Sequence, residues 1–166
     1  MAMKTPIKPK TKTLLFTRHA IALDQDIAAE QGIPDADREL TAQGTKKFDS
    51  YVKKHKKLFK NTDVFMTSPY IRAKQTLDII LKLKSVHKKK SKIFKFLRPD
   101  DSPMQFLKWV MNSQLEKVVA ISHEPFMSHF MNALLGPHWK TQKIKKGHVI
   151  KIQFKKNGEK IKYKMF

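Results

Sequence analysis

The 166-residue chain contains no cysteine, only five glycines and no long apolar run. Without cysteine there can be no disulfide, no thiolate metal ligand and no cysteine nucleophile. No stretch approaches the roughly 18 apolar residues of a membrane span, and the basic N-terminus lacks the apolar core of about 7–15 residues that a signal peptide needs. We therefore expect a protein of the reducing cytoplasm with no membrane partner.

Acidic residues are also scarce. Only 14 Asp and Glu stand against 35 Lys and Arg, and the formal net charge is +21. Such a charge attracts anions of every kind, from nucleic acids to phosphorylated proteins. The lysines are spread along the chain, so a purely solubilising role stays open. No helix-turn-helix, zinc-finger or stacking aromatic motif accompanies them, so a module that binds nucleic acid or another polyanion is kept only as the non-enzymatic alternative.

Arginine is the rare basic residue, with only four in the chain: Arg18, Arg38, Arg72 and Arg98. The rigid guanidinium fork binds a carboxylate or phosphate through two hydrogen bonds, which an ammonium group cannot do. A chain that uses lysine for its general surface charge is expected to keep arginine where such a fork is needed. Arg98, in the sequence LRPDD, is expected to be solvated or paired with a neighbouring aspartate.

The apolar pattern predicts strands that alternate with helices. Strands are expected at 12–18, 62–67, 92–97 and 117–122. Helices are expected after Thr41, where the helix runs to Phe59, and after Ser68-Pro69, Asp101 or Ser102, and 122–123. This alternation predicts a three-layer α/β/α fold with a mostly parallel central sheet.

Both ends of the chain differ from this pattern. Residues 1–12 carry two prolines and read as a flexible basic tail, and residues 13–166 form a single expected domain. At the C-terminus the alternation around Asn157-Gly158 predicts a β-hairpin, placed at the edge of the sheet.

Polar residues follow three of the predicted strands. The first strand ends in Arg18-His19, the second is followed by Ser68 and Arg72, and the fourth ends in Ser122-His123. In open α/β sheets, ligands bind beyond the carboxyl ends of the strands, so these groups are expected to converge on one edge. Two arginines, two histidines and a helix N-terminus suit a phosphoryl group, whose charge is spread over three oxygens.

The two histidines are expected to have different tasks. A neutral histidine can attack phosphorus and form a covalent intermediate, and nearby arginines disfavour its protonated form. The second histidine is expected to act as a charged hydrogen-bond donor. The spacing of six between His123 and His129 does not fit the spacing of four that places two zinc ligands on one helix face, so no metal site is expected.

Four motifs, TRHA, RELTAQG, TSPYIRAKQT and ISHEP, resemble in this order those of the histidine phosphatase (phosphoglycerate mutase-like) superfamily, especially its small phosphohistidine phosphatases of the SixA type. The resemblance covers about residues 14–136. It implies that His19 is the nucleophile that becomes phosphorylated, that Arg18 and Arg72 clamp phosphate, and that His123 is the second pocket histidine. It also implies that no metal or organic cofactor is used.

Other residues carry weaker expectations. Arg38, in the segment RELT, is expected to line the pocket or brace its loop, and Ser68 and Glu124 are expected to bind substrate. Larger members of the superfamily protonate the leaving oxygen with a carboxylic acid. Here no single residue stands out for that task, and the candidates are Asp24, Asp100, Asp101 and Glu124.

The predicted function is the removal of phosphate from phosphohistidine on a protein through a phosphohistidine enzyme intermediate. A phosphohistidine leaves as an imidazole, which needs less help from a positioned acid than an alkoxide does. The expected partner is a phosphorylated protein, such as a histidine phosphotransfer domain, and inorganic phosphate or sulfate is expected to bind in the pocket of a monomer. A phosphatase for small or polyanionic phosphoesters is the enzymatic alternative.

Overall fold

The computed structural model describes residues 11–86, 90–140, 142–155 and 161–166. Its strands form one six-stranded sheet in the order β3-β2-β4-β1-β5-β6. Their bounds are β1 (Thr11–Arg18), β2 (Val64–Thr67), β3 (Ser91–Ile93), β4 (Lys117–Ser122), β5 (Val149–Lys155) and β6 (Ile161–Met165). The helices are α1 (Gln25–Glu30), α2 (Ala42–Lys54), α3 (Ile71–Leu81), α4 (Pro103–Asn112) and α5 (Phe126–Leu135).

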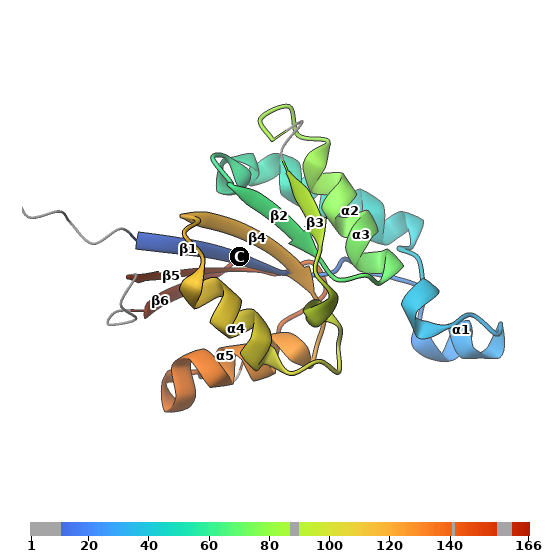
Figure 1. Cartoon of the computed structure of the whole chain (residues 1–166). Coiled ribbons are helices and arrows are strands. Elements are labelled where there is room, and N and C mark those ends of the chain that lie inside the picture. Colours follow the sequence, from blue (N-terminus) through green and yellow to red (C-terminus); the bar gives the residue numbers. More distant parts are fainter. Residues whose placement is uncertain (1–10, 87–89, 141, 156–160) are drawn as a thin grey trace, which may run out of the picture.

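The sheet is mixed, as the sequence predicts. Strands β1 to β4 are paired in parallel, whereas β5 pairs antiparallel with both β1 and β6. Helices α2 and α3 cover one face of the sheet and α4 and α5 cover the other, while α1 lies beyond the arrowheads of β2 and β4 (Figure 1). The predicted three-layer α/β/α fold with a C-terminal hairpin at the sheet edge is therefore confirmed.

Burial on both faces explains why the central strands are apolar without alternation. In β1, Leu14 and Phe16 pack into the core under α4 and α5, and Leu15 packs into the core under α2 and α3. In β4, Val118 and Ala120 join the first core, and Val119 and Ile121 join the second. Successive residues of a strand point to opposite faces, so a continuous apolar run supplies both cores at once.

Several element boundaries differ from the sequence expectations. The helix expected to run to Phe59 ends at Lys54, and residues Lys56–Phe59 tighten into a 3₁₀ turn that buries the Phe59 ring completely. The strand expected at 92–97 is only three residues long, because this edge strand is exposed along its length and Lys95–Leu97 form another 3₁₀ turn. Two predicted helix caps are confirmed: Thr41 accepts a hydrogen bond from the Gly44 amide, and Ser102 accepts one from the Met104 amide.

The expected N-terminal tail and the expected C-terminal hairpin lie partly outside the described residues. The expected tail falls on residues 1–12, of which only Thr11 and Lys12 are described, and both belong to β1. The Lys12 side chain is buried, and its ammonium group donates to the Val110 and Met111 carbonyls at 2.8 and 2.9 Å, at the C-terminal end of α4. The predicted turn at Asn157-Gly158 lies outside the described residues. Over the ranges that are described, no helix is both long enough and apolar enough to cross a bilayer.

Candidate active site

Strand register sets the polar residues of three strands at one level of the sheet. Thr17 of β1 and Thr67 of β2 both pair with Ile121 of β4. The residues that follow are therefore side by side at the carboxyl ends of the strands. The His19 amide donates to the Ser122 carbonyl at 3.0 Å, and the Ser68 amide donates to the Ile121 carbonyl at 3.0 Å.

His19 is held in one tautomer by two contacts. Its Nδ1 lies 2.7 Å from the Ala20 carbonyl oxygen, an atom that can only accept, so Nδ1 carries the proton. Its Nε2 accepts a hydrogen bond from Arg72 Nε at 3.3 Å. The side chain is buried, with 4% of its surface exposed. These contacts leave the lone pair on Nε2, the ring nitrogen that lies next to the arginine.

Burial and neighbouring cations keep this ring neutral. Burial is the largest cause that lowers the pKa of His19, and the charges of Arg72, Arg18 and Lys146 lower it further, while the hydrogen bond to Ala20 opposes them. The result is a pKa of about 3. The expectation that arginines keep the histidine neutral therefore holds, although burial contributes more than the arginines do.

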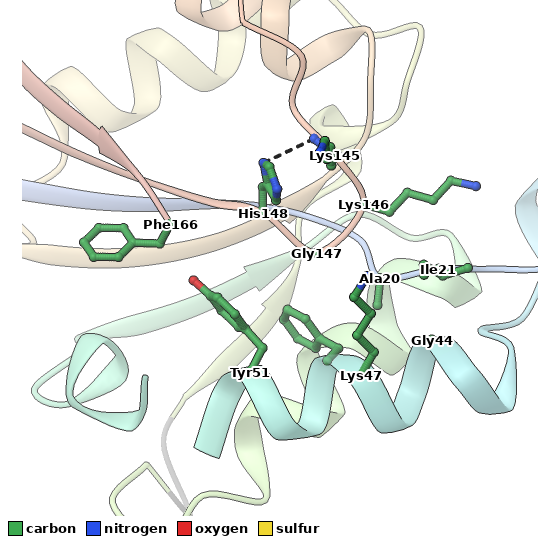
Figure 2. A pocket seen from close by; sticks show the side chains of 11 residues that line it. Ala20, Ile21, Gly44, Lys47, Tyr51, Lys145, Lys146, Gly147, His148 and Phe166 are labelled. Carbon is green, nitrogen blue, oxygen red and sulfur yellow. Dashed lines mark hydrogen bonds between the residues drawn. The ribbon is translucent and has the colours of Figure 1, made fainter. Parts of the chain in front are cut away.

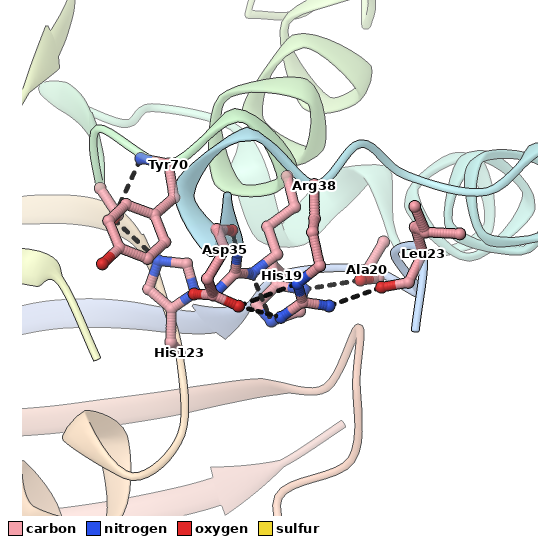
Figure 3. Close-up of polar contacts among 9 residues, drawn as sticks. His19, Ala20, Leu23, Asp35, Arg38, Tyr70 and His123 are labelled. Atoms are coloured by element: carbon pink, nitrogen blue, oxygen red, sulfur yellow. Dashed lines mark hydrogen bonds and ion pairs between the residues drawn. The ribbon is translucent and has the colours of Figure 1, made fainter. Parts of the chain in front are cut away.

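Arg72 comes from the first turn of α3 and is bound on both sides. Besides donating to His19, its Nη1 donates to the Asp35 carbonyl, and its Nη2 lies 3.0 Å from Asp35 Oδ2. Arg38 approaches the same carboxylate, with Nη2 2.7 Å from Oδ1, and also donates from Nη1 to the Leu23 carbonyl at 2.5 Å. Figure 3 shows the ion pair between Asp35 and Arg38 and the hydrogen bond from Arg38 to Leu23. Asp35 thus occupies the guanidinium fork of Arg72, which was expected to bind phosphate.

Sequence reasoning missed Asp35. It lies in a 3₁₀ turn, Asp35–Asp37, between α1 and α2. Burial alone would raise the pKa of this carboxyl, but hydrogen bonds from Arg38 and Arg72 outweigh it and hold the pKa below its ordinary value. The only signal in the sequence is the spacing of three between Asp35 and Arg38, which gives no hint of the distant partner in α3.

Arg18 is held by the loop before β5. Its Nη1 donates to the Ile144 carbonyl at 2.6 Å, and its Nε is buried without a hydrogen-bond partner among the described residues. Burial lowers the pKa of Arg18, and the charge of Glu124 opposes this effect. A buried guanidinium N–H without a partner is a donor available to an anion in the cavity.

His123 faces His19, with ring centroids 5.0 Å apart. Its Nε2 lies 2.8 Å from Ser68 Oγ, and its Nδ1 is buried without a partner among the described residues. Burial, followed by the charges of His19, Arg72, Arg18 and Arg38, lowers its pKa to about 2. Burial among cations thus favours the neutral imidazole, and the charged donor expected for the transferring phosphoryl group stays a prediction.

Ser68 has a different place from the one expected. It does not line the cavity, and its hydroxyl holds His123 and accepts a weak hydrogen bond of 3.4 Å from the Tyr70 amide. It does not begin the helix either, because α3 starts at Ile71 with Tyr70 in the capping position. The Tyr70 ring lies 5.1 Å from the His123 ring and 4.8 Å from the Arg72 guanidinium carbon, so it completes the packing around both groups.

A polar cavity of about 400 Å³ opens in front of these groups. Its wall combines residues from the ends of β1 and β4 with residues of the loops around α1, before α4 and before β5. The lining residues are Arg18, His19, Asp24, Gln25, Asp35, Arg38, Arg72, Pro99, Asp100, Glu124, Pro125 and Lys146. His123 does not line the cavity itself, but its ring packs against His19, which does.

The four candidate acids are placed differently. Asp101 does not line the cavity and pairs with Arg98 at 2.9 Å, the pairing expected for that arginine. Asp24 lines the cavity but accepts a hydrogen bond from the Asp26 amide at the start of α1. Asp100 and Glu124 also line it, and one carboxylate oxygen of Glu124 is buried without a partner among the described residues. Within the same ranges, no group of three or more acidic, histidine or cysteine side chains is placed to hold a metal ion.

No protein-family model matches the sequence. An uncharacterised protein of the cyanobacterium Picosynechococcus is 30% identical over 125 residues, which cover 73% of this chain and 72% of that protein.

Solved structures share the fold. A SixA protein of Agrobacterium tumefaciens superposes with a TM-score of 0.73 at 16% identity, covering 86% of this chain and 92% of that one. The protein histidine phosphatase SixA in complex with tungstate gives 0.67 at 21% identity, over 92% and 94% of the two chains. A phosphoglycerate mutase of Plasmodium falciparum gives 0.66 at 17% identity, over 95% and 91%.

Proposed function

We propose that the chain is a member of the histidine phosphatase superfamily that its motifs resemble, and that it removes phosphoryl groups from phosphohistidine on a protein. The observation that carries the proposal is the tautomer of His19. The Ala20 carbonyl holds the proton on Nδ1, so Nε2 carries the lone pair beside a cavity lined by arginines. Arg72 Nε donates to this lone pair, and in the proposed reaction it turns to the phosphoryl oxygens when Nε2 attacks. The fold shared with SixA proteins supports the same assignment.

The proposed reaction has two steps. In the first, Nε2 of His19 attacks phosphorus and a new P–N bond forms, while the P–N bond to the substrate histidine breaks. The electron pair of the broken bond stays on the substrate ring, which leaves as a neutral imidazole because its other nitrogen carries a proton. In the second step water attacks phosphorus, the bond to His19 breaks with its electrons returning to Nε2, and inorganic phosphate keeps the protons of the water.

The surrounding groups stabilise the transferring phosphoryl group in both steps. Arg18 offers its unpartnered Nε, and Arg72 lies beside the attacking nitrogen. An oxyanion between these cations raises the pKa of His123, because the negative charge favours the imidazolium form. His123 then donates to the phosphoryl oxygens, which is the expected role of a charged hydrogen-bond donor. Nδ1 of His19 keeps its proton and its contact with Ala20 throughout.

The test is to incubate the protein with a phosphorylated histidine phosphotransfer protein and to measure both phosphate release and phosphate on His19. We expect acid-labile phosphate on His19 during turnover, and we expect His19→Ala to abolish both signals while leaving the circular dichroism spectrum unchanged. His129, which is exposed on α5 and outside the cavity, provides the matched control, and His129→Ala should behave as wild type. A fully active His19→Ala variant would contradict the proposal.

The same assay separates the alternatives. Faster turnover of sugar phosphates or polyphosphate than of the phosphoprotein would favour the small or polyanionic phosphoesters that the net charge of +21 attracts. Binding of nucleic acid that falls steeply with salt and is indifferent to His19 and Arg18 would favour the non-enzymatic alternative.

A further inference from the structure

A second cavity, of about 330 Å³, lies beside the catalytic one and has a different character. Its interior is formed by apolar side chains from three distant parts of the chain: Ile21 after β1, Phe48 in α2 and Phe166 after β6. Tyr51 of α2 also lines it. Figure 2 shows Lys47 reaching up from α2 towards Ala20, with the loop 145–147 opposite. The volume is at the low end for ligand pockets and suits one large side chain.

The rim of this cavity carries basic side chains, from Lys47, Lys145, Lys146 and His148. Among the described residues, no Asp or Glu side chain lines it. The pKa of Lys146 is lowered, first by partial burial and then by the charges of Arg18 and Arg38, and the pKa of His148 is lowered by burial and by Lys145. The three lysine ammonium groups around the rim give it a positive field that an acidic partner would neutralise.

Tyr51 adds a polar group that has no partner. Its hydroxyl oxygen is buried and makes no hydrogen bond to the described residues. Burial raises the pKa of this hydroxyl to about 12, so it stays protonated. A buried hydroxyl without a partner is costly, and a carbonyl or carboxylate oxygen from an occupant would satisfy it.

The two cavities are joined at the end of β1. Ala20 directly follows the nucleophile His19 and lines the second cavity, while Lys146 lines both. The Gly147 amide donates to the Arg18 and His19 carbonyls at 3.2 and 3.0 Å, so the loop between the cavities is fixed to the strand that carries the nucleophile. An occupant of the second cavity is therefore next to whatever is bound in the first.

We propose that this second cavity binds a phenylalanine or similarly large apolar side chain, flanked by acidic residues, on the phosphoprotein substrate. The proposal rests on the function proposed above and adds a specificity site to it. A protein segment fits better than a free small molecule, because one side chain fills the apolar interior while its neighbours in the chain reach both the lysines and the phosphoryl pocket. Phosphorylated proteins without this acidic and apolar segment are expected to be poor substrates.

Charge reversal at the rim tests the acidic part. Lys47→Glu should lower kcat/KM for a phosphorylated histidine phosphotransfer protein that carries such a segment by about tenfold or more. It should leave turnover of phosphoramidate, which is too small to span both cavities, within about twofold. Lys46 is the matched control, because it is the adjacent exposed lysine on α2 and does not line the cavity. Equal losses for Lys46→Glu and Lys47→Glu would indicate general charge attraction and overturn the proposal.

Two short peptides test the apolar part. Acetyl-Asp-Phe-Asp-amide should compete with the phosphoprotein and shift the NMR signals of Ile21, Gly44 and Gly147, whereas acetyl-Asp-Ala-Asp-amide should do neither. Equal binding of both peptides, or shifts confined to the catalytic cavity, would contradict the site. If wild type hydrolyses neither phosphoramidate nor phosphoprotein, the proposed function fails, while the NMR shifts still report separately on the cavity.

Discussion

The neutral, buried histidine pair predicts a specific loss of stability in acid. His19 and His123 are neutral when folded, with pKa values of about 3 and about 2. In the unfolded chain each returns to an ordinary pKa of about 6.5. The unfolded state therefore binds more protons than the folded state whenever the pH is below about 6.5, and the free energy of unfolding must fall as the pH is lowered.

The size of this effect follows from the linkage relation. Between about pH 7 and about pH 5, each histidine costs about 2 kcal/mol of stability, and the pair costs about 4 kcal/mol. The figure depends only on the unfolded pKa as long as both folded values lie well below 5, which they do. Since a domain has only about 5–15 kcal/mol of stability, this loss is a large share of the total.

Urea unfolding followed by tryptophan fluorescence, in a buffer free of phosphate and sulfate, measures the loss. The wild type should lose about 4 kcal/mol more than the double variant His19→Gln/His123→Asn over this pH interval, and each single variant should recover about half. His129→Gln, an exposed histidine outside the cavity, should follow the wild type. Parallel pH dependences for the wild type and the double variant, within about 0.5 kcal/mol, would refute the neutral buried pair.

Two further predictions concern the walls of the site. Asp35→Asn removes the carboxylate charge that competes with an incoming oxyanion for Arg38 and Arg72. Tungstate or phosphate should therefore inhibit turnover at about tenfold lower concentration. An unchanged or higher inhibition constant would contradict this. In Gly44→Ala, the new Cβ would lie 2.1 Å from the Ile21 carbonyl oxygen, so α2 must move away from the loop after the nucleophile. We expect a loss of about 2 kcal/mol and a melting temperature lower by about 6 °C, measured calorimetrically against Gln43→Ala, which should change little.

The convergence of the candidate site residues could be predicted from the sequence because their positions depend on strand ends. A buried strand of a parallel sheet is apolar on both faces, so Leu14–Phe16 marks β1 directly, and the residue that breaks the apolar run marks its carboxyl end. The register of β1, β2 and β4 then brings these ends to one level, so Arg18, His19 and His123 converge without any loop having to be predicted.

The contacts between loops could not be predicted in this way. Asp35 meets Arg72 across 37 positions of sequence because a 3₁₀ turn between α1 and α2 folds over the end of the sheet. Serine at 68 has a strong propensity to cap a helix, but a buried hydroxyl beside His123 makes the tertiary contact and the helix begins later. In both cases the partner is chosen by packing, which local sequence does not encode.

The contact between Asp35 and the arginines bears on which substrates the site accepts. An incoming group must compete with a tethered carboxylate that carries one negative charge, and a phosphoryl dianion does so better than a monoanion because it interacts with the same cations through two charges. The same arginines hold Asp35 ionised, so it cannot supply a proton to a leaving group. Under the proposed function, a phosphoester would need such a proton for its alkoxide, whereas the ring of a phosphohistidine can take up its proton from water before the P–N bond breaks. Asp35 is therefore excluded as a general acid, whereas Asp100 and Glu124 still line the cavity.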